Sequence, residues 1–199
     1  SEPVLIESDA AVQTIPLNQG WSWISLNVTA FDLSLNTLLN DISPSNGDFI
    51  KSQTAFSQYH ESTGWKGSLR TFETGKSYQI YSQNNANMRN AGTPIDVQTT
   101  TIPVESGWNW IGYFHQEILD INDALATMPA SAGDRIKSQT EFAEYVSTTG
   151  TWEGSLDKLM PGQGYLLKSN TGGDLEYPEL AKTGSLHAFS EKPEWSVDA

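Results

Sequence analysis

Polar and hydrophobic residues alternate over short stretches of this chain, a spacing typical of β-strands with one buried face. Trp21 and Trp23 are separated by one polar residue, and so are Trp108 and Trp110. A short apolar run and a glycine precede each pair. This order predicts a strand, a glycine turn and a second strand, the pattern of a β-hairpin. Both indoles of a pair should share one face of the second strand.

Helical spacing of apolar residues occurs once in each half of the chain. Residues 33–39 and 119–125 each fit about two turns of helix, and a proline follows each segment. Side chains suited to capping open these segments: Asp32, Ser34, Asp120 and Asn122. We therefore predict one short helix in each half.

The two halves repeat the same blocks of sequence. Ile50–Thr54 recurs unchanged as Ile136–Thr140, 86 residues later. The tryptophan pairs lie 87 residues apart, so small insertions and deletions fall in the loops between blocks. We predict a mainly β (α+β) fold of two tandem homologous units, each a small antiparallel sheet or barrel with one short helix.

The repeat also sets the expected boundaries. Residues 1–13 form a leader or edge strand, 14–84 the first unit, 85–100 a linker with a possible strand at 94–97, 101–170 the second unit, and 171–199 a C-terminal extension in which a further module begins near Trp195. The predicted core of the first unit consists of Trp21, Trp23, Ile24, Leu35, Leu38, Ile50, Phe56, Leu69 and Tyr78, with the aligned positions in the second.

Four blocks of the second unit carry a resemblance: Gly107–Ile111, Gly133–Gln139, Trp152–Leu156 and Pro161–Tyr165. Together they resemble tandem tryptophan-rich modules of secreted, multidomain bacterial cell-surface or carbohydrate-active proteins. The first unit departs from the pattern at Ser22, Thr74 and Lys76–Ser77. The resemblance implies an extracellular or cell-surface location and neighbouring modules on the same polypeptide. It supplies no catalytic residue.

Charge and composition exclude several classes of partner. The chain has 24 acidic and 11 basic residues and a net charge of −13. Nucleic acids and anionic lipids are bound through Lys and Arg, so this balance argues against both. No apolar run is long enough for a membrane helix, so we expect no membrane insertion. The absence of cysteine excludes disulfides and thiolate metal sites.

Catalysis finds little support in the sequence. The three histidines have no counterparts in the other half, and no Ser/His/Asp spacing is suggestive. Asp48 and Asp134 would have to face each other across a cleft to act as a glycosidase pair, and nothing in their spacing indicates this. We expect no enzymatic activity, no cofactor and no dedicated metal site.

The predicted ligand-binding residues centre on Trp65 and Trp152, because adjacent glycines would leave their ring faces open. Tyr59 and Tyr145 would add stacking surface. The polar side chains expected to bind sugar hydroxyls are Lys51, Lys137, Gln53, Gln139, Asp48 and Asp134. The structural alternative is that the glycines admit a neighbouring strand, the aspartates cap turns and the glutamines satisfy backbone groups.

These observations favour a non-catalytic extracellular carbohydrate-binding module over an enzyme. A neutral polysaccharide or glycan is the expected partner, because the negative chain repels anions. The alternative is a structural spacer or adhesion module without a small ligand. An exposed aromatic strip would favour binding, whereas buried or scattered tryptophans would favour the spacer. The Trp21/Trp23 and Trp108/Trp110 pairs could form a sugar-stacking platform, but two indoles on one strand face more often pack in the core, and we assign them there.

Overall fold

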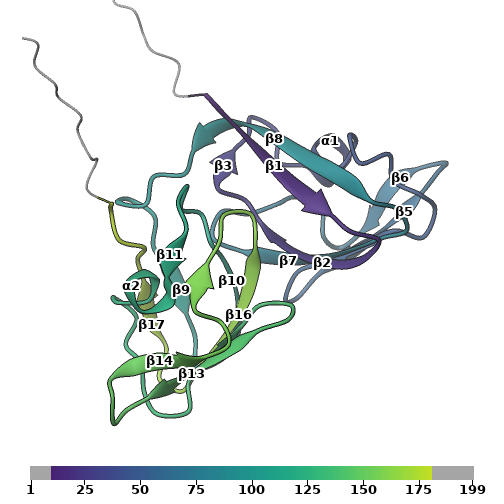
Figure 1. The fold of residues 1–199 in the computed structure, drawn as a ribbon. Helices are drawn as coiled ribbons and strands as arrows, with labels where there is room; N and C mark the ends of the chain where they lie inside the picture. The colour runs from purple at the N-terminus through teal and green to yellow at the C-terminus, as the bar shows by residue number, and fades with distance from the viewer. Residues whose placement is uncertain (1–9, 181–199) are drawn as a thin grey trace, which may run out of the picture.

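The structure is a computed structural model that describes residues 10–180. It is mainly β and consists of several small antiparallel sheets with two single-turn helices (Figure 1). The first of two five-stranded sheets contains, in spatial order, β2 (Gly20–Ser25), β7 (Ser77–Ser82), β4 (Phe49–Lys51), β5 (Phe56–His60) and β6 (Gly64–Gly67). The second contains β10 (Gly107–Gly112), β16 (Gly164–Ser169), β12 (Arg135–Lys137), β13 (Phe142–Val146) and β14 (Thr151–Gly154).

Three smaller sheets accompany these two. They are β1 (Ala11–Leu17) with β8 (Ala86–Pro94) and β3 (Val28–Thr29), β9 (Ile102–Val104) with β17 (Gly173–Leu175), and β11 (Leu119–Asp120) with β15 (Lys158–Leu159). Figure 1 shows the purple β1 lying along the teal β8. Each smaller sheet brings together segments from distant parts of the sequence.

The predicted hairpins across Gly20 and Gly107 are wrong. β1 pairs with β8, whereas β2 pairs with β7, so the two strands that flank Gly20 belong to different sheets. In the same way β9 pairs with β17 and β10 with β16. Gly20 and Gly107 are the first residues of β2 and β10, with φ of 97° and 105°, and the bend before each of them directs the chain into another sheet.

The two helices are shorter than predicted. α1 (Leu35–Leu38) and α2 (Ile121–Ala124) have four residues each, because Leu39 and Leu125 already leave the helical conformation. The Asp120 carboxylate accepts a hydrogen bond from the Asn122 N–H at 2.8 Å and so caps α2.

The buried apolar residues form two clusters, one between Ile15 and Met88 and the other between Ile95 and Tyr177. The predicted core positions Ile24, Leu35, Leu38, Ile50, Leu69 and Tyr78 are all buried. Trp21, Trp23 and Phe56 were predicted to be buried with them and are not: Trp21 and Phe56 are exposed and Trp23 is half-buried. Alternation explains the error, since Ser22 and Ile24 occupy the core face of β2 and the indoles must occupy the other.

The segments outside the two predicted units contain strands. β8 fills most of 85–100, but it ends at Pro94, where the expected strand was to begin. β17 lies within 171–199. Residues 1–9 and the expected start of a further module at Trp195 lie outside the described residues.

The two large sheets approach each other closely at positions occupied by glycine. The Gly112 N–H donates to the Gly75 carbonyl at 2.9 Å, and the Ser25 N–H donates to the Gly162 carbonyl at 3.0 Å. A Cβ at Gly112 would lie 2.7 Å from the Lys76 carbonyl oxygen, and one at Gly164 would lie 2.6 Å from the Ile24 carbonyl oxygen. Neither φ is positive, so the requirement for glycine is steric.

We therefore expect Gly112→Ala and Gly164→Ala each to lower the free energy of unfolding by about 1–3 kcal/mol, as overpacking does. Chemical denaturation would measure this. Gly20→Ala is the control, because a Cβ there meets no atom within 4 Å and costs only backbone strain, roughly 1 kcal/mol. If the Gly112 and Gly164 variants proved no less stable than the Gly20 variant, the close approach would be contradicted.

His115 is the buried histidine of the described chain, next to the junction of the sheets. Its Nδ1 accepts a hydrogen bond from the Glu117 N–H at 3.0 Å, and its ring stacks on Tyr113. Burial disfavours the charged ring and lowers the pKa of His115 below its usual value. An unfolded histidine, with a pKa of about 6.5, therefore takes up a proton before the folded one does.

Because the unfolded state binds more protons below pH 6.5 or so, stability should fall as the pH drops from about 7 to 5. His115→Asn keeps an acceptor for the Glu117 N–H but cannot be protonated. We expect urea denaturation to show a smaller loss of stability over this range for the variant. Equal losses in the two proteins would assign the pH dependence to other groups.

Candidate functional site

Trp65 and Trp152 lie in the core, each with 5% of the residue exposed. The expectation that their ring faces are open is therefore wrong. Each indole packs edge-on against a half-buried tyrosine, Tyr59 at 5.6 Å and Tyr145 at 5.5 Å between ring centroids.

The glycines beside these indoles serve the neighbouring strand. A Cβ at Gly67 would lie 2.2 Å from the carbonyl oxygen of Phe56, and one at Gly154 would lie 2.2 Å from that of Phe142. Glycine is needed here because the backbone of the paired neighbouring strand approaches closely. The small residues therefore admit a strand rather than a ligand.

Asp48 and Asp134 are almost fully buried and hold loops together. Asp48 accepts hydrogen bonds from the backbone N–H groups of Ser45 at 2.9 Å and Gln83 at 3.0 Å. Asp134 accepts the corresponding bonds from Ser131 at 2.9 Å and Asn170 at 2.8 Å. The described structure thus gives both carboxylates backbone partners, as in the structural alternative.

Gln53 and Gln139 reach from one sheet to the edge strand of the other. The Gln139 side chain donates to the Trp21 carbonyl at 2.8 Å and accepts from the Trp23 N–H at 3.2 Å. The Gln53 side chain donates to the Trp108 carbonyl at 2.8 Å and accepts from the Trp110 N–H at 3.0 Å. We call this pair of contacts the glutamine clasp.

Lys51 and Lys137 lie between tryptophans of the two sheets. The Lys51 Nζ is 5.0 Å from the ring centroid of Trp21 and 5.7 Å from that of Trp110. The Lys137 Nζ is 5.0 Å from Trp108 and 5.9 Å from Trp23. Through these cation–π contacts each lysine joins a tryptophan of the other sheet to a tryptophan of its own. We call the contacts of Lys51 and Lys137 with the four tryptophans the seam.

An aromatic cluster of three exposed residues and one half-buried residue, Phe49, covers the outer side of the first sheet. Its members are Trp21, Phe49, Phe56 and Tyr81, which we call the first face. The Trp21 ring lies edge-on to Phe49 at 6.2 Å and to Tyr81 at 5.5 Å, and Phe49 stacks on Phe56 at 5.4 Å. Although Lys51 covers part of the ring, Trp21 is 40% exposed. Apolar side chains gathered in this way on a surface usually mark a contact site.

The outer side of the second sheet carries the corresponding second face, made of Trp108, Arg135, Phe142 and Lys168. Trp108 is 43% exposed, and Phe142 is exposed as well. Arg135 pairs in register with Lys168, as Phe49 does with Tyr81 in the first sheet. The two faces thus share an exposed tryptophan and an exposed phenylalanine. They differ at the two positions between these residues, where the first face has aromatic side chains and the second has basic ones.

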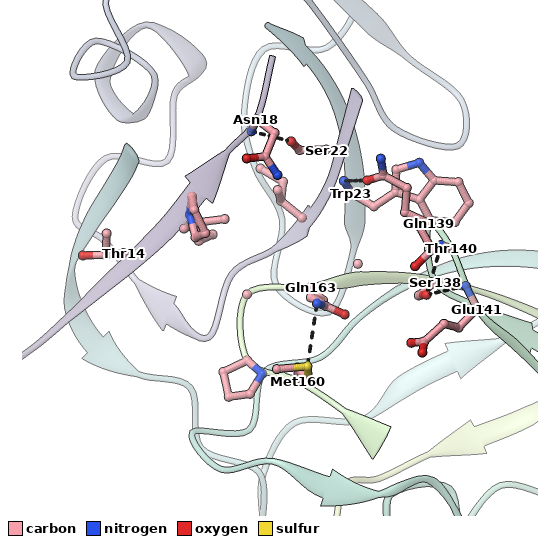
Figure 2. Close-up of a pocket in the computed structure, with 16 residues that line it drawn as sticks. Thr14, Asn18, Ser22, Trp23, Ser138, Gln139, Thr140, Glu141, Met160 and Gln163 are labelled. Atoms are coloured by element: carbon pink, nitrogen blue, oxygen red, sulfur yellow. Dashed lines mark hydrogen bonds between the residues drawn. The ribbon is translucent and has the colours of Figure 1, made fainter. Parts of the chain in front are cut away.

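Two polar clefts lie where the sheets meet. One, of about 430 Å³, is shown in Figure 2, with Trp23 and Gln139 side by side in its lining and the hydrogen bond between them drawn. The other, of about 320 Å³, is lined by the corresponding Gln53 and Trp110. In both clefts the glutamine already uses its amide for the clasp, so less of the polar lining is available to a ligand.

Among residues 10–180, no group of three or more His, Cys, Asp or Glu side chains is placed to hold a metal ion. Within the same range, no helix has the length and apolar character needed to cross a membrane. Comparison with protein-family models, curated protein sequences and solved structures finds no match for this chain.

Gln53→Ala and Gln139→Ala each remove two hydrogen bonds from an edge strand. Each bond contributes about 0.5–1.5 kcal/mol net, so each variant should lose roughly 1–2 kcal/mol of unfolding free energy. Thermal and urea denaturation would measure the loss. Gln58→Ala is the matched control, since Gln58 is an exposed strand glutamine that makes no side-chain hydrogen bond to a described residue. Losses equal to that of Gln58→Ala would mean that the clasp contributes nothing.

Proposed function

We propose that this chain is a non-catalytic extracellular binding module for carbohydrate, built from two tandem homologous units within a larger bacterial surface or secreted protein. The single observation that carries the proposal is the exposed tryptophan on the outer side of each large sheet, Trp21 and Trp108. The neighbouring modules and the bacterial, cell-surface setting rest on the sequence resemblance.

The sheet geometry supports the tandem-unit part of the proposal. Both five-stranded sheets use the same strand order, with the tryptophan-containing strand at one edge. Trp21 pairs in register with Tyr81, and Trp108 pairs with Lys168 at the aligned position. The repeated sequence blocks therefore occupy the same places in both sheets, as duplication of one unit would produce.

An exposed aromatic strip is the feature that distinguishes a binding module from a spacer. Indole and phenyl rings match the apolar faces of pyranose sugars, and large aromatic side chains dominate many binding surfaces. Leaving Trp21, Phe49, Phe56 and Tyr81 together in water is unfavourable unless something covers them. We therefore propose that Trp21 and Trp108, rather than the buried Trp65 and Trp152, contact the ligand.

Two linked sites would offset the weakness of each. One ring and a few hydrogen bonds must overcome desolvation and ordering costs, so a single face should bind weakly. A polysaccharide that touches both faces makes the second contact intramolecular and gains affinity through effective concentration. The seam at Lys51 and Lys137 fixes the two sheets relative to each other, which reduces the entropy lost on such binding.

The proposal assigns no catalytic role. Asp48 and Asp134 are buried against backbone N–H groups, an environment suited to holding loops rather than to transferring protons to a substrate.

One observation favours the spacer or adhesion alternative. The glutamines expected to bind sugar hydroxyls, Gln53 and Gln139, instead tie the two sheets together. Such a junction is what a rigid spacer between modules requires. This alternative predicts no retention on any glycan.

The test is affinity electrophoresis of the wild type, Trp21→Ala, Trp108→Ala and the double variant in gels that contain neutral polysaccharides. Each stacking contact is worth about 0.5–1.5 kcal/mol, so each single variant should bind roughly two- to tenfold more weakly, and the double variant more weakly still.

Phe31→Ala is the control, because Phe31 is fully exposed and belongs to neither face. It should leave retention unchanged. Retention of the folded double variant at the wild-type level would overturn the assignment of the site, and no retention of the wild type on any polysaccharide would favour the spacer.

A further inference from the structure

The two faces differ in charge where they differ in sequence. The row that starts at Trp21 continues across the sheet through Tyr81 and Phe49. The row that starts at Trp108 continues through Lys168 and Arg135. This second row ends on Glu144 and Glu153, where the first row ends on Gln58 and Lys66. Two aromatic residues on the first face are therefore replaced by two cations on the second. The chain holds only 11 basic residues, so this concentration near an exposed indole is a specific feature of the second face.

A hollow of about 480 Å³ lies on the second face. It is lined by Trp108, Arg135, Ile136, Lys137 and Phe142. Its volume is within the range of small-ligand pockets. Two exposed aromatic residues and two cations thus border one space, and no carboxylate is among the residues that line it.

The two acidic side chains in the same row as Arg135, namely Glu144 and Glu153, have partners of their own. Glu144 binds Arg135 through a single contact, from Oε2 to Nε at 2.8 Å. Because a guanidinium has five N–H donors, most of the Arg135 donors remain for another acceptor. The Glu153 carboxylate accepts hydrogen bonds from the Thr149 hydroxyl at 2.6 Å and the Thr151 hydroxyl at 3.2 Å, at the turn between β13 and β14. Neither Lys137 nor Lys168 forms an ion pair with a described residue.

The charges beside the hollow, rather than the net charge of the chain, decide whether an anion in the hollow is attracted or repelled. The net charge of −13 is spread over the whole chain and is screened beyond about 10 Å at 0.1 M salt. A group in the hollow would lie beside Arg135 and Lys137, and arginine binds carboxylate and sulfate-like anions through paired hydrogen bonds. The first face has Phe49 at the position of Arg135 and offers no such fork.

We infer that the hollow beside Trp108 binds an anionic group, carboxylate or sulfate, on a sugar of the glycan ligand, whereas the first face binds neutral sugar. The indole and Phe142 contact the sugar ring, and Arg135 and Lys137 contact the anion, with Lys168 adding positive potential. The inference rests on the proposed function and specifies its ligand class. It also departs from the expectation of a purely neutral glycan drawn from net charge.

The test is isothermal titration of the full chain with tetragalacturonate, its methyl ester and a carrageenan tetrasaccharide, whose only anions are sulfates. The acid or the sulfated probe should bind about tenfold more tightly than the ester at about 0.1 M salt, where the net charge is screened, and raising the salt further should erase the difference. Which of the two anions binds more tightly distinguishes carboxylate from sulfate as the recognised group.

Arg135→Phe/Lys168→Tyr gives the second face the side chains of the first. This variant should lose the preference for anions and retain binding of the ester. Lys66→Gln/Arg70→Gln removes two exposed cations of the first half and is the control for net charge; its preference should be unchanged.

The outcomes separate the two proposals. If the wild type binds the ester as tightly as both anions, or if the preference survives Arg135→Phe/Lys168→Tyr, the anion inference is overturned and the carbohydrate proposal stands. If none of the three probes nor a neutral polysaccharide binds, both are overturned. A preference that Lys66→Gln/Arg70→Gln removes equally would assign it to net charge and overturn the inference.

Discussion

The structure depends on how the backbone of two edge strands is satisfied. β2 and β10 lie at the edges of the large sheets, and an edge strand presents unpaired N–H and C=O groups. In each case the other sheet supplies the partners. A glutamine side chain takes the place of a peptide group opposite the tryptophans, and the backbone at Gly162 or Gly75 pairs with the end of the strand. Each half therefore protects the exposed edge of the other.

This exchange explains why particular blocks are alike in both halves. Gln139 comes from one block, Gly162 from a second, and the strand that they cover from a third. At Gly112 and Gly164 a Cβ would clash with a carbonyl oxygen of the other half. The two sheets can therefore approach each other only within a narrow range of distances. The shared glutamines and lysines are thus accounted for by contacts between the sheets, and the shared aspartates by loops within each half. The part of each outer side that these contacts leave in solvent carries the exposed aromatic residues.

The sequence predicted a mainly β chain with short helices, and every aliphatic residue that it assigned to the first core is buried, because period-two and helical patterns are local signals. It did not predict that β1 pairs with β8, since pairing between distant segments leaves no local trace. The burial of Trp65 was missed because an adjacent glycine admits a strand as readily as a ligand. The exposure of Trp21 was available in principle: Ile24 is buried, and alternation then places Trp21 on the opposite face.

Some residues of each sheet contact the other sheet and some do not, and this difference indicates where the two halves were free to diverge. A residue at the seam, such as Lys137, contacts tryptophans of both sheets, so its replacement would disturb two environments at once. Arg135 and Lys168 lie one row further out, where a side chain affects only its own face and the solvent. Substitutions there change what the face can bind at little cost to the fold, because exposed positions tolerate exchange. The chemical difference between the faces is therefore found where the structural constraint is weakest, while the tryptophans beside it are held in place by the seam.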